Sequence, residues 1–164
     1  MPTYSLDLGC GPTPKNFFNA DIVYGIDVRD ELEKNIYKAD LITDKIPFDD
    51  AFFDFVTAHD FIEHIPRVLY TPNRSYPFVE LMNEIWRVLK PSGKLYSLTP
   101  AFPAAAAFFD PTHLNFVTEL TFSEGFSVNN PHTKAAGFKG EFKIESQNRQ
   151  GPYLISILKK VEST

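Results

Sequence analysis

Residues 6–11 read Leu-Asp-Leu-Gly-Cys-Gly, and this stretch decides how the rest of the chain is interpreted. The apolar run from Tyr4 to Leu8 predicts a short β-strand. The strand must end in a turn, because Gly9, Gly11 and then a proline follow it. Glycine has no Cβ, so the backbone can turn sharply there and a ligand can approach it closely. Asp7 places a carboxylate beside that turn.

A second carboxylate follows the next predicted strand. Ile22 to Val28 is rich in β-branched residues and predicts a strand with Asp27 near its end. An acid in this position can accept hydrogen bonds from both hydroxyls of a ribose. Pro12 and Pro14 remove backbone N–H groups that a dinucleotide's diphosphate would need. The pattern therefore favours a ligand that carries ribose and adenine without phosphate.

Helical spacing of apolar residues is clearest from Ser75 to Lys90, where Ser75 is expected to cap the helix and the Pro-Ser-Gly at 91–93 to end it. Shorter helices are expected at 15–20 and 30–38. Further strands are expected at 38–42, 53–58, 94–98, 142–145 and 153–158, the last two forming an antiparallel pair. This alternation predicts an α/β protein with one Rossmann-like, doubly wound, mostly parallel sheet, in a single domain spanning 1–164.

Composition narrows the possible partners. The formal net charge is −5 and the pI is near 5.3, which argues against a protein that coats nucleic acid phosphates. The longest apolar run, Ala101 to Phe109, is too short to cross a bilayer, for which about 20 residues are needed. Cys10 is the single cysteine, so an internal disulfide is impossible. We expect a cytoplasmic protein with no membrane partner.

The ordered set of motifs resembles the class I, Rossmann-like S-adenosylmethionine-dependent methyltransferases, in their compact branch. Residues 6–11 resemble the first motif of that family, and residues 25–28, Gly-Ile-Asp-Val, resemble the second. Residues 39–41 with 46–50, residues 53–56 with 62–65, and residues 84–95 resemble the segments that follow. The sequence departs from the family at Pro12-Thr13-Pro14, where a third small residue is usual.

The resemblance implies S-adenosylmethionine as cofactor, with Asp27 on the ribose hydroxyls and Asp40 near the adenine amino group. The residues expected to bind the cofactor are Asp7, Gly9, Cys10, Gly11, Asp27, Val28, Asp40, Leu41, His59 and Asp60.

Methyl transfer from a sulfonium needs no acid, since the leaving group is neutral, so alignment of the reactants does most of the catalysis. A base is needed only when the acceptor arrives protonated. His59, after the fourth strand, and His113, in a polar cluster after the fifth, are the candidate bases. His64 is expected mostly to pack. We expect the partner to be a small molecule or another methyl acceptor.

Two other functions stay open. Pro12, Pro14 and the lack of a helix ahead of the first strand suggest a non-catalytic cofactor-binding or interaction module. A metal-dependent hydrolase would need His59 and Glu63 at helical spacing; we expect no metal. The segment Ala101 to Phe109 is expected to be a mobile lid, a buried helix or the face of a homodimer.

Overall fold

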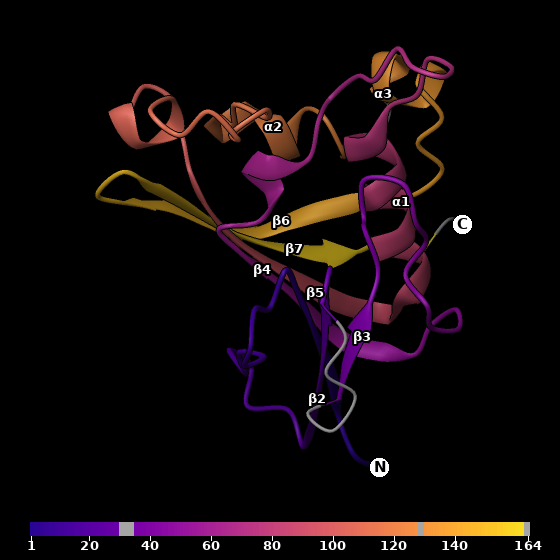
Figure 1. Ribbon diagram of the computed structural model, residues 1–164. Helices are drawn as coiled ribbons and strands as arrows, with labels where there is room; N and C mark the ends of the chain where they lie inside the picture. The colour runs from indigo at the N-terminus through magenta and orange to yellow at the C-terminus, as the bar shows by residue number, and fades with distance from the viewer. Residues whose placement is uncertain (30–34, 128–129, 163–164) are drawn as a thin grey trace.

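A computed structural model describes residues 1–29, 35–127 and 130–162. It contains a seven-stranded sheet in the order β3-β2-β1-β4-β5-β7-β6 (Figure 1). The first five strands run parallel, whereas β7 is antiparallel to both β5 and β6. This confirms the predicted fold class. The bounds are β1 (Tyr4–Leu8), β2 (Ile22–Asp27), β3 (Ile36–Lys38), β4 (Phe53–His59), β5 (Leu89–Pro100), β6 (Phe142–Gln150) and β7 (Tyr153–Lys160).

The main helix, α1 (Pro77–Val88), packs its apolar face on the sheet, where Leu6 and Leu8 belong to the same buried core. Its first turn differs from the prediction, because Tyr76 occupies the N-cap position without a side-chain hydrogen bond and Pro77 opens the helix. Ser75 instead pairs with Leu69 as an isolated bridge, which takes it out of the capping position.

The end of α1 also differs from the prediction. The helix ends at Val88, and β5 begins at once because Leu89 pairs with Phe53 of β4. Residues 91–93 therefore lie within β5, where the register against β4 shifts and Ser92 has a φ of 61°. The three residues form an irregularity in a long strand rather than a loop between a helix and a strand.

The helix expected at 15–20 is absent from this described segment. The Asn16 side chain accepts a 2.8 Å hydrogen bond from the Ala20 N–H and donates one of 2.9 Å to its carbonyl, which closes a turn instead. Phe17 stacks on Tyr96 and Phe18 stacks on Phe55, with ring centroids 3.9 Å and 4.4 Å apart. Aromatic side chains of this loop thus cover sheet residues that a helix would otherwise shield.

The segment between β2 and β4 corrects two further predictions. Of the helix expected at 30–38, residues 30–34 lie outside the described residues, and Ile36–Lys38 forms β3 through pairing with β2. The strand expected at 38–42 does not form, because β3 already ends at Lys38. The chain then turns, because the Asp40 carbonyl accepts hydrogen bonds from the N–H groups of Thr43 and Asp44.

Short helices and helical turns connect the later strands: η2 (Ile62–His64), η3 (Ala105–Ala107), α2 (Glu119–Ser123) and α3 (Pro131–Ala135), the last three in the upper part of Figure 1. The expectation of a buried helix at 101–109 is wrong, because Phe102, Phe108 and Phe109 are exposed and only a single turn forms. In the described part of the chain, no helix is long and apolar enough to cross a membrane.

Candidate active site

Asp27, the last residue of β2, is joined to the turn that follows β1. Its Oδ2 accepts a 2.9 Å hydrogen bond from the Gly11 N–H, and its Oδ1 accepts hydrogen bonds from the backbone and the Nε of Arg29. Partial burial acts to raise the pKa of this carboxyl, but the hydrogen bonds from Arg29 and Gly11 outweigh it and lower the pKa. Asp27 is therefore an ionised acceptor at neutral pH.

The turn itself depends on its glycines. Gly9 and Gly11 both have a φ of 61°, in the region that side chains rarely adopt. A Cβ on Gly9 would lie 2.3 Å from Cδ2 of Phe61, so the aromatic ring occupies the space that glycine leaves. The Cys10 N–H donates a 3.1 Å hydrogen bond to the Ile26 carbonyl, which fastens the turn to β2.

The Cys10 thiol is buried within this turn. Burial, reinforced by the negative charges of Asp7 and Asp27, raises its pKa from 9.0 to about 11. The side chain also occupies space beside Gly25, where an added Cβ would lie 2.4 Å from the Cys10 sulfur. The thiol is thus a neutral packing group at physiological pH.

A cavity of about 190 Å³ opens beside the turn and between the ends of β2 and β3. Five predicted residues line it: Gly9, Asp27, Val28, Asp40 and Leu41. The other lining residues were not predicted: Ile26, Ala39, Ile42, Phe61, His64 and Ile65. Phe61 directly follows the predicted Asp60, but nothing in the sequence indicates that its ring turns back over Gly9.

Asp7 lies below the turn and is almost fully buried. Its Oδ1 accepts a 2.6 Å hydrogen bond from the Thr57 hydroxyl, and its Oδ2 accepts one of 2.8 Å from the Lys15 N–H. Nδ1 of His59 lies 3.4 Å from the same Oδ1. Asp7 therefore ties β1, β4 and the loop after β1 together.

The predicted residues after β4 and β3 are more exposed. His59 ends β4 with its ring 4.9 Å from that of Tyr96, and Asp60 has a φ of 48° and donates its N–H to the Leu98 carbonyl. Asp40 is exposed, and its Oδ1 accepts a 3.1 Å hydrogen bond from the Ile42 N–H.

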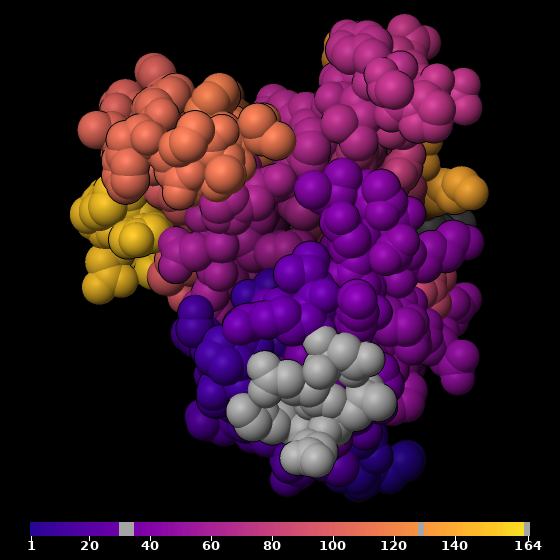
Figure 2. Space-filling model, viewed as in Figure 1, coloured from indigo at the N-terminus to yellow at the C-terminus, as the bar shows by residue number. Residues whose placement is uncertain are grey.

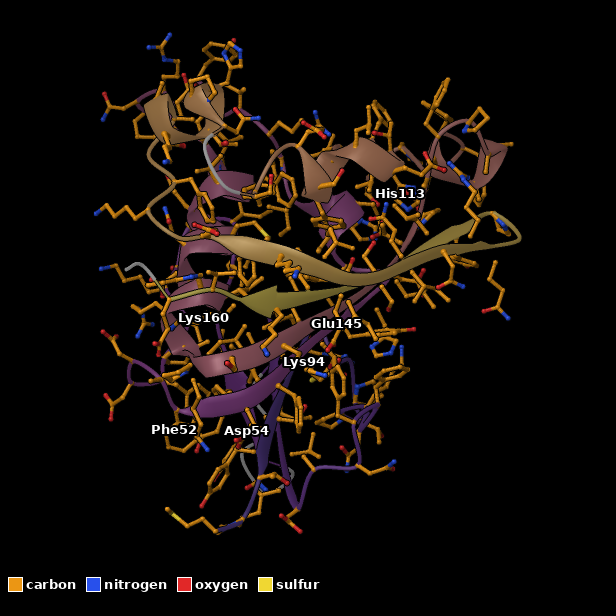
Figure 3. All side chains as sticks on the ribbon, turned by 180° about the vertical axis from the view of Figure 1, so that it is seen from behind. Phe52, Asp54, Lys94, His113, Glu145 and Lys160 are labelled. Carbon is orange, nitrogen blue, oxygen red and sulfur yellow. The ribbon has the colours of Figure 1, made fainter. Side chains whose placement is uncertain are left out.

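His113 lies in the segment after β5, beyond the carboxyl end of the sheet (Figure 3). Its ring centroid is 4.9 Å from that of His64, whose chain neighbour Glu63 is buried. Burial raises the pKa of Glu63, and its Oε2 accepts a 2.8 Å hydrogen bond from the Thr99 hydroxyl. His59 ends a strand, so it does not share one helix with Glu63 as the hydrolase alternative required.

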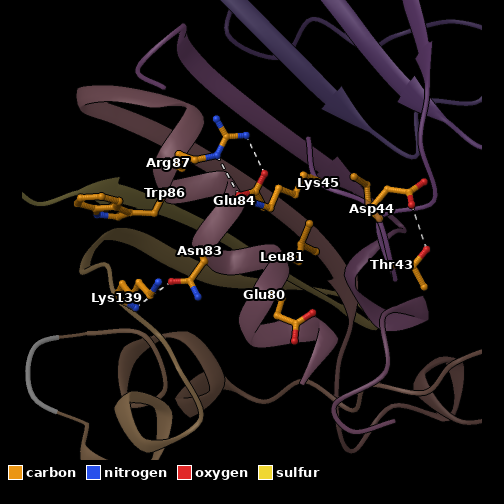
Figure 4. A pocket seen from close by; sticks show the side chains of 11 residues that line it. Thr43, Asp44, Lys45, Glu80, Leu81, Asn83, Glu84, Trp86, Arg87 and Lys139 are labelled. Carbon is orange, nitrogen blue, oxygen red and sulfur yellow. Dashed lines mark hydrogen bonds and ion pairs between the residues drawn. The ribbon is translucent and has the colours of Figure 1, made fainter. Parts of the chain in front are cut away.

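Two larger hollows lie outside the cavity beside Gly9. One, of about 410 Å³, follows α1 and is lined mostly by polar residues, among which Glu84 pairs with Arg87 (Figure 4). The other, of about 500 Å³, lies between the segments around Arg67 and around Leu120, and Figure 2 shows the upper edge of the molecule notched between these two parts.

Comparison with known proteins identifies the family. The sequence model of the family described as "Methyltransferase domain" matches residues 6–97, more than half of the chain. A search of curated protein sequences found no match.

Solved structures share the fold. An S-adenosylmethionine-dependent methyltransferase from Aquifex aeolicus is 20% identical with a TM-score of 0.60, over 98% of this chain and 82% of that one. The [4+2]-cyclase SpnF is 17% identical with a TM-score of 0.65, over 97% and 74%. Phosphoethanolamine N-methyltransferase 1 from Haemonchus contortus, in complex with phosphoethanolamine and S-adenosylhomocysteine, is 13% identical with a TM-score of 0.67, over 99% of this chain and 40% of that one. The chain therefore belongs to the methyltransferase-domain family, and it shares its fold with S-adenosylmethionine-dependent methyltransferases.

Proposed function

We propose that this enzyme transfers the methyl group of S-adenosylmethionine to a small-molecule acceptor, and that the cofactor binds in the cavity beside Gly9. The observation that carries the proposal is that Gly9, Asp27 and Asp40, which come from three separate segments, line one cavity at the carboxyl edge of the sheet. Ligands of doubly wound sheets bind at this edge.

Each residue has a proposed part in holding the cofactor. Asp27 accepts hydrogen bonds from the two ribose hydroxyls. The hydrogen bond from Arg29 Nε to Oδ1 breaks when the ribose binds. Gly9 and Gly11 admit the ligand close to the backbone, while Val28, Asp40 and Leu41 border the adenine. Asp7 and Cys10 act from below the turn by fixing its shape, and His59 and Asp60 border the methionine end.

The bound cofactor supplies an electrophilic methyl on a sulfonium, whose sulfur leaves as a neutral thioether. The chain's task is to align the acceptor and, where the acceptor is protonated, to remove its proton. His59 suits this role, because a carboxylate oxygen of Asp7 faces its Nδ1 and can only accept. The proton then lies on Nδ1, and Nε2 keeps a free lone pair. His113 is the second candidate base.

The formal net charge of −5 supports a small-molecule acceptor over a nucleic acid. The exposed Phe102, Phe108 and Phe109 support a homodimer or a hydrophobic wall for the acceptor. We also propose that residues 1–164 form one domain, and that the protein is cytoplasmic, since its single cysteine has no internal partner.

The test is a transfer assay with S-adenosylmethionine carrying a deuterated methyl group and a mixture of small hydroxyl, amine and thiol compounds, read by mass spectrometry. We expect one acceptor class to gain the labelled methyl as S-adenosylhomocysteine accumulates in equal amount. Binding of S-adenosylhomocysteine without any transfer would instead favour the non-catalytic module.

A further inference from the structure

We propose that Glu63, His64 and His113 bind a divalent first-row transition cation beside the cofactor cavity. One carboxylate oxygen of Glu63 and one ring nitrogen from each histidine lie within 4.8 Å of one another. Two imidazoles and a carboxylate form the ligand set that suits zinc, manganese, iron or cobalt, with further coordination positions left open for water or another oxygen ligand.

The distances between ligand atoms are close to those of a bound site. Ligand atoms about 2.0–2.2 Å from one metal ion lie roughly 3–4 Å from one another. The observed spread of 4.8 Å therefore closes with shifts on the order of an ångström, which side-chain rotation provides.

The orientation of His64 leaves a ligand atom available. Its Nδ1 lies 3.2 Å from the Thr112 carbonyl oxygen, which can only accept, so the ring proton belongs on Nδ1. Nε2 then carries the lone pair that a cation binds. The Thr112 hydroxyl lies 3.1 Å from the same Nδ1 and donates to Asp110, so a chain of contacts outside the cluster fixes the ring.

His113 provides an independent observation. Its side chain is only 9% exposed, and its Nδ1 is buried without a hydrogen-bond partner. The other ring nitrogen, Nε2, lies 3.9 Å from Oδ2 of Asp110, which leaves Nδ1 as the ring nitrogen available to a cation. A buried ring nitrogen left unpaired costs about 1–3 kcal/mol, and a metal ion on that nitrogen removes the cost.

Glu63 presents a buried carboxylate with no cationic side chain to balance it. It is 1% exposed, and among the ion pairs of the described residues none joins it to a lysine or an arginine. Its carbonyl accepts hydrogen bonds from the N–H groups of Leu114 (2.7 Å) and Asn115 (2.9 Å). The segment that carries His113 is thereby fixed against η2, so the three ligands are held together before any ion binds.

The position of the cluster connects it to the methyl-transfer site. His64 also lines the cavity beside Gly9, so a cation held there lies at the border of the proposed cofactor site. In that arrangement His113 serves as a ligand, and His59 remains as the candidate base. The cation site itself rests on the three side chains and not on the proposed function.

The experiment is a titration of Co²⁺ into the full chain after removal of metals with EDTA and dialysis, followed by visible absorption and by calorimetry. We expect one Co²⁺ per chain with d–d bands, displaced by Zn²⁺. Glu63→Gln and His113→Ala should each weaken binding at least tenfold, with folding checked by circular dichroism. The matched control is His132→Ala, which removes an exposed histidine of α3 and should leave binding unchanged.

Two results would overturn the proposal: no stoichiometric Co²⁺ binding to the folded protein, or equal affinity in the wild-type and His113→Ala proteins. Where a ligand variant fails to fold, the wild-type titration decides alone. S-adenosylhomocysteine affinity of the metal-free protein, measured in parallel, separates this proposal from the proposed function, because each ligand can bind while the other does not.

Discussion

The Gly11 N–H donates a 2.9 Å hydrogen bond to Oδ2 of Asp27 and so joins the turn after β1 to the end of β2. Both residues belong to segments that the sequence marks as a ribose site. The bond holds the carboxylate at the edge of the cavity before a ligand arrives. Pre-organisation of this kind lowers the ordering cost of binding.

Replacement of Asp27 tests its role in that site. Asp27→Ala removes a charged acceptor for two ribose hydroxyls, and hydrogen bonds to charged groups contribute about 1.5–3 kcal/mol. We expect S-adenosylhomocysteine to bind about 10- to 100-fold more weakly by calorimetry. Asp49→Ala, on an exposed loop, is the control and should bind normally. Unchanged affinity in Asp27→Ala would remove this residue from the site.

The close contact between Gly9 and Phe61 predicts a stability difference between two glycines. Gly9→Ala meets both a positive φ and the Phe61 ring, whereas Gly151 has a φ of 59° with nothing within 4 Å of an added Cβ. The positive φ costs about 1–2 kcal/mol and the clash about 1–3 kcal/mol more. Denaturant unfolding should show that Gly9→Ala lowers the free energy of unfolding more than Gly151→Ala does. Equal losses of stability in the two variants would refute the contact between Gly9 and Phe61.

Cys10 gives a pH-dependent prediction. Because its pKa is raised to about 11, the folded protein keeps the thiol proton at pH values where the unfolded chain has lost it. Stability should therefore fall as pH rises from about 9 to about 11. The rate of Cys10 alkylation in the folded protein should keep rising over that pH range. In guanidinium, where the chain is unfolded, the rate should reach its plateau at a lower pH. A folded-state rate that levels off near pH 8.5 would contradict the buried, charge-flanked environment.

Arg87 is expected to stabilise the fold rather than to bind a ligand, although it lines the hollow beside α1. It donates to both carboxylate oxygens of Glu84, and to the carbonyls of Ile46 and Phe48. Lysine cannot reproduce this planar set of donors. We expect Arg87→Lys to lower the free energy of unfolding by about 1–3 kcal/mol, against no change for the exposed Arg74→Lys. Equal stability of the two variants would contradict this role.

The mostly parallel sheet and the acids near the strand ends were predictable because they depend on local patterns. Residues 53–58 are rich in apolar residues and lie between turn signals, and Asp27 lies near the end of a β-branched strand. Parallel strands then bring their carboxyl ends to one edge without any knowledge of side-chain packing. The convergence of Asp27 and Asp40 on one cavity follows from the same geometry.

Features that depend on contacts between distant segments were not predictable. The loop at 15–20 is shaped by Asn16 and by aromatic stacking on β4 and β5, and not by helical periodicity. Ser75 is drawn into a bridge with Leu69, which no local capping rule anticipates. The grouping of Glu63 and His64 with His113 joins residues far apart in sequence, and the sequence alone suggested Glu63 with His59 instead.

The account depends most directly on occupancy of the cavity beside Gly9. Calorimetric titration of the full chain with S-adenosylmethionine and with S-adenosylhomocysteine should give saturable binding of one molecule per chain, and the bound ligand should slow alkylation of Cys10. Absence of heat and of any thermal shift at millimolar concentrations of both compounds would contradict the central claim.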